Sequence, residues 1–301
     1  MRAAIFSEYG GPEVLRVSEV DTPVAGAGQV RVRVRAAGVQ PYDLAVRAGW
    51  TPPGVTAPLP RIPGNEFAGV VDEVGAGATG VAAGDEVLGF GQVQAYAEYV
   101  VVPASHVTPK PAEMPWEVAG GFTSGAQTAS LALEELAAGP GDVLLVHGAA
   151  GAVGTMAVQL AVRAGARVIG TAAPDNHDYL RELGAAPVAY GSGLAQRVRA
   201  LGGATAALDG AGGEALDASL ELVADRRRIL TLVDHHRAAE LGVRVVEGVR
   251  SARRLATLAD LYAKGEVRFH VRRTYPLERA ADAHRALESG HGRGKIVLLV
   301  D

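Results

Sequence analysis

One segment constrains the fold more than any other. In VLLVHGAAGAVGTMAVQLA, residues 143–161, an apolar run meets three evenly spaced glycines, Gly148, Gly151 and Gly154. The run before the glycines has the character of a buried strand, and the apolar spacing after them is that of an amphipathic helix. A second strand-like run, RVIGTA at 167–172, follows. This order predicts a strand–helix–strand unit whose sharp corner falls at the glycines.

Such a corner is either a packing feature or a binding site for a dinucleotide. Without side chains, the glycines let the backbone approach a pyrophosphate, and the amides and dipole at the start of the helix stabilise its charge. The strand–helix–strand context favours the binding site. Its expected members are Gly148, Gly151, Ala152, Val153 and Gly154.

The end of the second strand indicates which dinucleotide would bind. An acidic side chain there would accept hydrogen bonds from the adenosine ribose of NAD(H), whereas this chain has Thr171, Ala172 and Ala173. No carboxylate at this point opposes a 2′-phosphate. We therefore predict NADPH as the cofactor, with Thr171 in its site; Asp175, a little further along, keeps NADH as the alternative.

The rest of the sequence shows two kinds of pattern. Residues 1–112 carry short β-rich runs between glycines and prolines, and Val30, Val32 and Val34 alternate with arginines, as in a strand with one wet face. From about residue 115, helix-like and strand-like runs alternate, which is typical of a parallel sheet covered by helices. The final run, GKIVLLV, is expected to rejoin the amino-terminal domain. We predict an α/β plus β-barrel fold, with a discontinuous barrel-like domain at 1–114 and 266–301 and a doubly wound parallel-sheet domain at 115–265.

The composition of the chain excludes several kinds of site and partner. The chain of 301 residues has no cysteine, which excludes disulfides, thiolate zinc ligands and a cysteine nucleophile. Its net charge of −4 gives no electrostatic reason to expect nucleic acid as a partner. The amino-terminal residues lack the pattern of a secretory leader, and no apolar window reaches the length of a membrane span. We therefore expect a cytoplasmic protein with no membrane partner.

The whole chain resembles the zinc-independent quinone oxidoreductase branch of the medium-chain dehydrogenase/reductase superfamily. The matching segments keep their order across both halves: EYGGPEVL, AAGVQPYDLAVRAG, PGNEFAGVVDEVGAGATGVAAGDEVLG, AYAEYVVVPA, the glycine turn, RELGA, LDGAGGEALDASL and GKIVLLV. The resemblance implies a GroES-like barrel domain, a Rossmann domain, a cleft between them for NADPH and a small-molecule substrate, and a homodimer.

The resemblance also assigns the catalytic and metal positions. The three ligands of the zinc-dependent relatives correspond to Gln40, Asn65 and Ser124; two amides and a hydroxyl are poor zinc ligands, so we expect no metal. Tyr42 stands where those relatives keep a hydroxyl for proton relay, and it is either a proton donor or part of the cleft wall. Gln40 and Asn65 either position the acceptor's oxygen or give ordinary hydrogen-bond support. Asp43 is expected to cap or brace its loop.

Further cofactor contacts follow from the resemblance. Two residues would lie beside the nicotinamide, Thr128 through its side chain and Val233 through its backbone. The 2′-phosphate would meet Tyr190. A lysine that often accompanies this tyrosine is replaced by Asn176, so positive charge is expected from the tail, from Arg293 or Lys295.

Three functions stay open at this point. The first is hydride transfer from NADPH to a quinone or conjugated enone, and the second is reduction of an enoyl thioester or of a biosynthetic intermediate, with Tyr42 as the acid for the enol. The third is a non-catalytic NADPH-binding protein. Gln40 and Ala45 depart from the asparagine and tyrosine that are usual in the quinone branch, which leaves the acceptor open. Trp50 and Tyr96 would either wall a flat pocket or serve packing.

Overall fold

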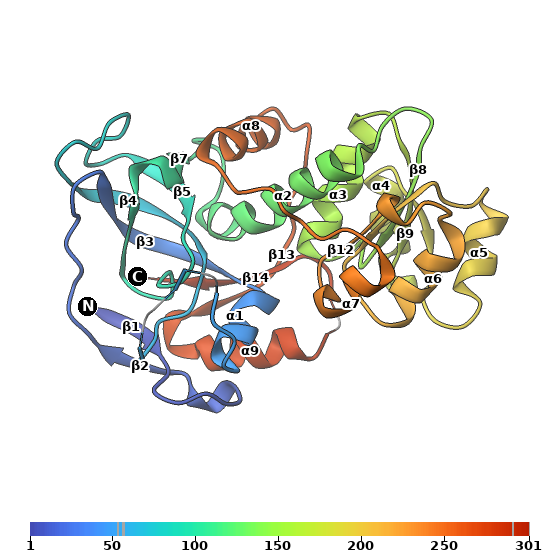
Figure 1. Cartoon of the computed structure of the whole chain (residues 1–301). Helices are drawn as coiled ribbons and strands as arrows, with labels where there is room; N and C mark the ends of the chain where they lie inside the picture. Colours follow the sequence, from blue (N-terminus) through green and yellow to red (C-terminus); the bar gives the residue numbers. More distant parts are fainter. Residues whose placement is uncertain (53, 56–57, 291, 301) are drawn as a thin grey trace. The chain divides into compact units, whose positions relative to one another are not determined.

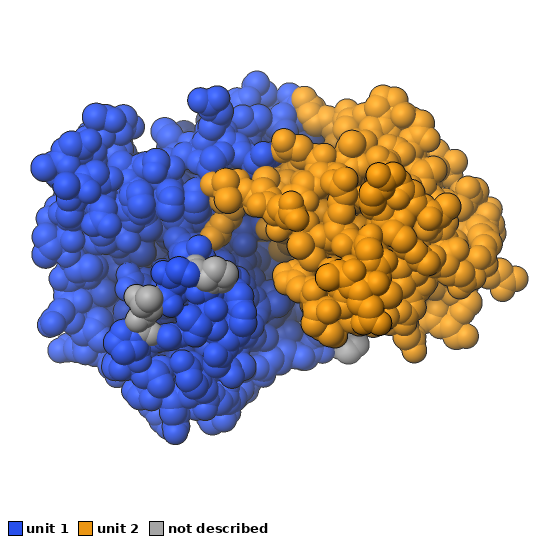
Figure 2. Space-filling model, viewed as in Figure 1, with its two compact units in different colours: residues 1–124, 251–266, 270–301 blue, residues 125–250, 267–269 orange. Residues whose placement is uncertain are grey.

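A computed structural model describes residues 1–52, 54–55, 58–290 and 292–300 (Figure 1). The chain divides into two compact units (Figure 2). Unit 1 consists of Met1–Ser124, Ser251–Glu266 and His270–Asp301, and unit 2 of Gly125–Arg250 and Val267–Phe269. Residues 251–265, which the sequence pattern groups with 115–250, thus lie in unit 1. The boundaries of the functional domains stay a prediction.

Unit 1 is built on a sheet with the strand order β13-β14-β3-β4-β5-β7, with β6 also paired to β3. A small antiparallel pair, β1 and β2, accompanies it. Along β3 the valines at 30, 32 and 34 are buried and the arginines between them are more exposed, as their alternation predicts. The strands are β1 (Arg2–Ile5), β2 (Arg16–Glu19), β3 (Gln29–Val39), β4 (Glu66–Val74), β5 (Glu86–Phe90), β6 (Tyr99–Pro103), β7 (Val107–Pro109), β13 (Val271–Pro276) and β14 (Lys295–Leu299).

The carboxyl-terminal strand β14 lies between β13 and β3. It runs antiparallel to β3, with Ile296 opposite Val39 and Leu299 opposite Ala36. The prediction that this run rejoins the amino-terminal domain is therefore confirmed. The helices of unit 1 are α1 (Pro41–Arg47), α8 (Ala252–Ala263), α9 (Ala280–Glu288) and the first part of α2 (Trp116–Leu136), together with the short 3-10 helices η1 (Pro12–Val14), η2 (Ala104–His106) and η5 (Leu277–Arg279).

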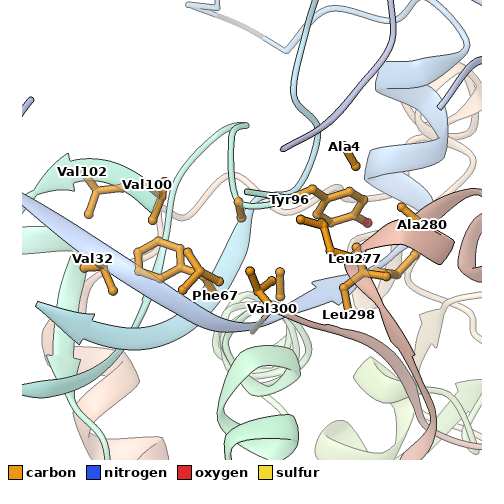
Figure 3. Close-up of a cluster of buried hydrophobic side chains, with 14 of the residues drawn as sticks. Ala4, Val32, Phe67, Tyr96, Val100, Val102, Leu277, Ala280, Leu298 and Val300 are labelled. Atoms are coloured by element: carbon orange, nitrogen blue, oxygen red, sulfur yellow. The ribbon is translucent and has the colours of Figure 1, made fainter. Parts of the chain in front are cut away.

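A hydrophobic core gathers strands of unit 1 around Phe67 and Tyr96 (Figure 3). Leu298 and Val300 reach it from the last strand and the residue after it, and Leu277 reaches it from η5. The side chain of Tyr96 is fully buried. Of the two roles considered for Tyr96, packing is the one that the structure shows.

Unit 2 contains a parallel sheet in the order β10-β9-β8-β11-β12. The strand–helix–strand unit predicted from the glycine segment is present as β8, α3 and β9. The elements are β8 (Val143–His147), α3 (Ala152–Arg163), β9 (Arg167–Thr171), η3 (Pro174–Asn176), α4 (His177–Glu182), β10 (Ala186–Val188), α5 (Leu194–Ala200), β11 (Ala206–Asp209), α6 (Glu214–Leu222), η4 (Arg226–Arg228), β12 (Ile229–Thr231) and α7 (His235–Leu241), with the second part of α2.

The order of the strands places a topological switch point in this sheet. From β8 the chain moves to one side through β9 and β10, and then returns to the other side through β11 and β12. Ligands of open parallel sheets bind beyond the carboxyl ends of the strands at such a point. The glycine turn follows the carboxyl end of β8, directly at the switch. Among the described residues, no helix has both the length and the apolar character that crossing a membrane requires.

Candidate functional site

The glycine turn has the backbone geometry of a dinucleotide-binding corner. Gly148 has a positive φ of 68°, and Gly151 precedes the first residue of α3 without a capping side chain. At Gly154, a Cβ atom would lie 2.3 Å from the Gly148 carbonyl oxygen and 2.6 Å from the Ala149 Cα. The helix therefore starts in close contact with the turn. Its first amides, uncapped by a side chain, form the kind of terminus that binds a phosphate.

A chain of hydrogen bonds through Thr171, His147 and Ser219 supports the glycine turn. The Gly148 N–H donates to the Thr171 hydroxyl (3.3 Å), which lies 3.4 Å from His147 Nδ1. His147 Nε2 lies 2.9 Å from the Ser219 hydroxyl. Burial lowers the pKa of His147 to about 4, against the opposing charge of Asp209, so the imidazole is neutral at pH 7. The Thr171 hydroxyl thus braces the turn, a role that the sequence analysis did not assign to it.

Asp209 organises the neighbouring strand ends and was missed from the sequence. Its Oδ1 accepts from the Ala211 and Gly212 N–H groups at 3.0 and 2.8 Å, and its Oδ2 accepts from the Thr231 hydroxyl at 2.8 Å. These bonds fix the loops that follow β11 and β12. Val233, which follows β12, is 46% exposed. The available signal was the motif LDGAGG, in which a lone acid ends an apolar strand before glycines.

The residues expected near the adenosine lie beyond the ends of β9 and β10. Tyr190 is 54% exposed, and Asn176 ends η3 and precedes α4 without forming a side-chain cap. Arg197, a residue that was not singled out from the sequence, holds the loop around Tyr190 by hydrogen bonds to its backbone. Its guanidinium donates to the carbonyl oxygens of Ala189, Tyr190, Gly191 and Ser192, at 2.8 to 3.3 Å. Arg197 is therefore committed to the backbone, and the tyrosine ring is left at the surface.

Helix α2 carries Thr128 past the start of α3. A Cβ at Gly125 would lie 3.2 Å from the Ala152 carbonyl oxygen, so the two helices approach closely there. Thr128, three residues further along α2, is half-buried. Thr128, the glycine turn and Thr171 thus all belong to unit 2, whereas Arg293 and Lys295 belong to unit 1.

In unit 1, Gln40 and Asn65 form a buried amide pair. Gln40 Nε2 donates to Asn65 Oδ1, and both side chains are nearly inaccessible, at 7% and 4% exposed. Lys295 Nζ donates to Gln40 Oε1 at 2.8 Å and forms an ion pair with Glu66 Oε1 at 2.5 Å. The second Glu66 oxygen accepts from the Ser124 N–H at 2.7 Å. These five residues make one continuous cluster, referred to below as the amide cluster.

Two glycines make room for the amide cluster. A Cβ at Gly38 would lie 2.1 Å from Glu66 Oε1, and one at Gly121 would lie 2.8 Å from Lys295 Cγ. Lys295 is 4% exposed and its ammonium is already bound by Glu66 and Gln40. The Lys295 ammonium is thus held inside unit 1 by these two partners. The role expected for Lys295 does not fit because its charge already neutralises a buried carboxylate.

Tyr42, in α1, contacts an amide side chain and an aromatic ring. Its hydroxyl donates to Gln92 Oε1 at 2.9 Å, and its ring meets Trp50 edge-on with the centroids 5.1 Å apart. Gln92 is exposed and was not singled out from the sequence. The Tyr42 hydroxyl therefore lies near the surface, bonded to the Gln92 amide, and the Tyr42 ring packs against Trp50. Both roles considered for Tyr42 stay predictions.

Comparison with known proteins matches both halves of the chain. Residues 26–112 match the alcohol dehydrogenase GroES-like domain, and residues 183–298 match a family described as zinc-binding dehydrogenase. A 2-haloacrylate reductase of Burkholderia sp is 30% identical over 99% of this chain and 98% of its own length. The solved quinone oxidoreductase of Coxiella burnetii superimposes with a TM-score of 0.89 at 29% identity, covering 100% of this chain and 99% of that one.

The chain belongs to the zinc-independent quinone oxidoreductase branch of the medium-chain dehydrogenase/reductase superfamily. The predicted fold, a GroES-like domain with a Rossmann-type parallel sheet, is thereby confirmed. The chain also matches the polyketide synthase GfsB of Streptomyces halstedii, with 34% identity over 91% of this chain. It spans only 5% of that much longer protein.

At the three positions that correspond to the zinc ligands of other branches of the superfamily, this chain has residues that are hydrogen-bonded within the protein. Gln40 and Asn65 are hydrogen-bonded to each other, and the Lys295 ammonium lies against the Gln40 oxygen. Ser124 contributes its backbone N–H to Glu66. Amides and a hydroxyl beside a fixed positive charge do not suit a second cation. Within the described part of the chain, no cluster of histidines and carboxylates forms a metal site either.

Asp43 braces the start of α1 beside this cluster. Its Oδ2 accepts from the Gln40 N–H (3.1 Å), in a capping box, and from the Tyr96 hydroxyl (3.0 Å). The expected capping role of Asp43 is confirmed. Burial raises the pKa of Asp43 to about 7, although the Lys295 ammonium and the Tyr96 hydroxyl act against this shift. Asp43 therefore titrates near neutral pH in the folded protein.

We predict that Asp43→Asn alters how stability depends on pH. The pKa of Asp43 is higher in the folded state than its ordinary value of 3.8, so its contribution to stability is present at pH 4 and is lost as the pH rises towards 7. The free energy of unfolding of the wild type, minus that of the variant, should fall by roughly 2–4 kcal/mol over this range, at about 1.4 kcal/mol per pKa unit. Urea unfolding at several pH values measures this difference.

The exposed Asp21 provides the matched control. For Asp21→Asn, the free energy of unfolding of the wild type minus that of the variant should stay nearly constant from pH 4 to 7. If the free energy of unfolding of Asp43→Asn changed with pH in parallel with that of the wild type, the elevated pKa of Asp43 would be contradicted.

Proposed function

We propose that this chain is an NADPH-dependent, zinc-independent reductase that adds hydride to a conjugated enone or a quinone. The glycine turn at the switch point carries the proposal, because it combines a close backbone approach with an uncapped helix start, as a pyrophosphate requires. The residues proposed to hold the cofactor are Gly148, Gly151, Ala152, Val153, Gly154, Thr128, Asn176, Tyr190, Val233 and Arg293, with Thr171 acting through the turn.

The preference for NADPH rests on the residues after β9. Thr171 is followed by Ala172 and Ala173, so no carboxylate stands where the ribose hydroxyls of NADH would be bound. Asp175 is exposed in η3. Titration with both nucleotides tests this preference; equal or tighter binding of NADH would refute it.

Chemically, the bound nicotinamide supplies the hydride, and the protein must handle the charge that follows. Hydride addition to a conjugated acceptor leaves negative charge on the acceptor's oxygen, which hydrogen-bond donors stabilise. We assign this role to the Gln40–Asn65 pair. Tyr42 is proposed to protonate the product, as its hydroxyl is a donor near the surface.

Reduction of an enoyl thioester is the second candidate. It is favoured by the similarity to polyketide synthases over 91% of this chain and to a reductase named for 2-haloacrylate, which is a conjugated alkene. NADPH oxidation with a simple quinone, a cyclic enone and an enoyl thioester distinguishes the candidates. Tight binding of NADPH without oxidation by any of them would instead favour a non-catalytic nucleotide-binding protein. Homodimer formation and a cytoplasmic location stay predictions.

Replacing Tyr42 by phenylalanine tests its proposed role. We expect kcat with the enone to fall about tenfold, less than the full effect of a general acid because water can also supply the proton. Protonation of the product should also lose its stereospecificity. Turnover with NADPH and analysis of the product in D2O measure both effects. Tyr9→Phe, at another partly exposed tyrosine, should change neither; an unchanged rate and stereochemistry in Tyr42→Phe would remove Tyr42 from the mechanism.

A further inference from the structure

The amide cluster contains a donor, the Lys295 ammonium, that fixes the direction of the hydrogen bonds made by its two amide side chains. An ammonium group has only donors, whereas an amide side chain can turn either its oxygen or its nitrogen towards a neighbour. Lys295 lies 2.8 Å from the Gln40 side chain, so the Gln40 atom that faces it must be the oxygen. The Gln40 nitrogen then faces Asn65 and requires the oxygen of Asn65 there.

The Lys295 ammonium thereby also sets the orientation of the Asn65 amide. With its oxygen bound by Gln40, Asn65 directs its N–H2 group away from Gln40. Glu66 keeps Lys295 in place and neutralises it, and is itself held by the Ser124 N–H. A Cβ at Gly38 would overlap Glu66, and one at Gly121 would crowd Lys295, so the ion pair uses the space that these two glycines leave. The orientation of both amides thus depends on the Lys295 ammonium, which is connected to Asn65 through Gln40.

We propose that Lys295 and Glu66 are positioning residues that set the Asn65 amide as a hydrogen-bond donor to the oxyanion formed on the acceptor. The inference rests on the proposed function, in which Asn65 lies beside the acceptor's oxygen. Without the ammonium, both amides are able to rotate by 180°, and in the rotated state Asn65 presents an oxygen that repels the oxyanion. Lys295 therefore acts on the reaction without touching the substrate.

Binding of an oxyanion probe tests the proposal independently of turnover. The probe is 4-nitrophenolate, which carries a single oxyanion on a flat ring, and 4-nitroanisole is its neutral counterpart. The quantity measured is the ratio of the two dissociation constants, by absorbance titration of the protein with and without NADP+. A general loss of structure weakens both ligands, whereas a loss of the donor weakens the phenolate alone.

Two charge-conserving changes interrupt the arrangement at different points. The double variant Lys295→Met/Glu66→Gln removes the ion pair, and Gln40→Leu cuts the connection between Lys295 and Asn65; neither alters the net charge. Each should lower the preference for phenolate about tenfold, the value of one hydrogen bond to a charged group. The triple variant should lower it no further, because residues that act as one unit are not additive.

Different outcomes separate this inference from the proposed function. A double variant that keeps the wild-type preference overturns the role of Lys295 and Glu66, as does a wild type that shows no preference for phenolate. NADPH-dependent reduction that persists in those cases leaves the proposed function intact. Conversely, a protein that reduces none of the acceptors but shows the predicted pattern with the phenolate retains the donor arrangement and loses the assigned reaction.

Discussion

Gly154→Ala is expected to weaken NADPH binding by about 100-fold, which corresponds to nearly 3 kcal/mol. The added methyl group would lie 2.3 Å from the Gly148 carbonyl oxygen and 2.6 Å from the Ala149 Cα. Both are backbone atoms, so no side chain can rotate to relieve the contact. The start of α3 must move away from the turn, and its amides then no longer converge on the pyrophosphate.

A graded series of glycines makes this test specific. The Cβ of an alanine at Gly151 would lie 3.3 Å from the Gly148 oxygen, and at Gly139 its nearest neighbour would be 3.8 Å away. Gly151→Ala should therefore weaken binding less than Gly154→Ala, and Gly139→Ala should leave it unchanged. Fluorescence titration with NADPH gives the affinities, and circular dichroism confirms folding. Binding by Gly154→Ala within threefold of the wild type would show that the turn does not hold the cofactor.

The second large effect concerns the amide cluster. Lys295→Met alone should lower the free energy of unfolding by about 3–5 kcal/mol, because it leaves the Glu66 carboxylate buried without its cation. Adding Glu66→Gln should restore most of this loss, since a neutral amide is far less costly to bury than an unpaired charge. Urea unfolding of the single and double variants measures both changes.

An exposed lysine in the same unit provides the control. Lys264 pairs with Asp260 at 2.6 Å, but its side chain is 57% exposed. Lys264→Met should change the free energy of unfolding by less than about 1 kcal/mol. A similar, small effect for Lys295→Met would mean that the Glu66 carboxylate finds another partner, and that the cluster does not depend on its ion pair.

Local patterns in the sequence predicted much of the fold. The strand, glycine turn and helix at 143–163 follow from periodicity and from residues without side chains, which are short-range properties. The alternation in β3 likewise follows from neighbouring residues. The capping role of Asp43 could be expected because it lies three residues after Gln40, the spacing that a capping box requires.

The parts that could not be predicted depend on contacts between distant residues. Lys295 and Gln40 are 255 positions apart, and no local pattern reveals that an ammonium near the end of the sequence meets an amide near its start. Arg293 or Lys295 was expected to replace a lysine of related proteins at the 2′-phosphate, whereas β14 carries Lys295 into the interior. Thr171 shows the same limit, because its hydroxyl accepts directly from the Gly148 N–H, 23 positions away, and also lies 3.4 Å from His147 Nδ1.

The insertion of β14 between β13 and β3 has a consequence for biosynthesis. On a ribosome, β3 emerges together with its neighbours β4 and β6 but long before its third neighbour, β14, and the sheet of unit 1 stays incomplete until residues 295–299 have been made. Unit 2, by contrast, draws nearly all of its residues from the continuous stretch 125–250 and can fold while the rest is still being synthesised. The buried carboxylate of Glu66 must therefore await Lys295, so the amide cluster can form only after the residues of unit 2 have been made.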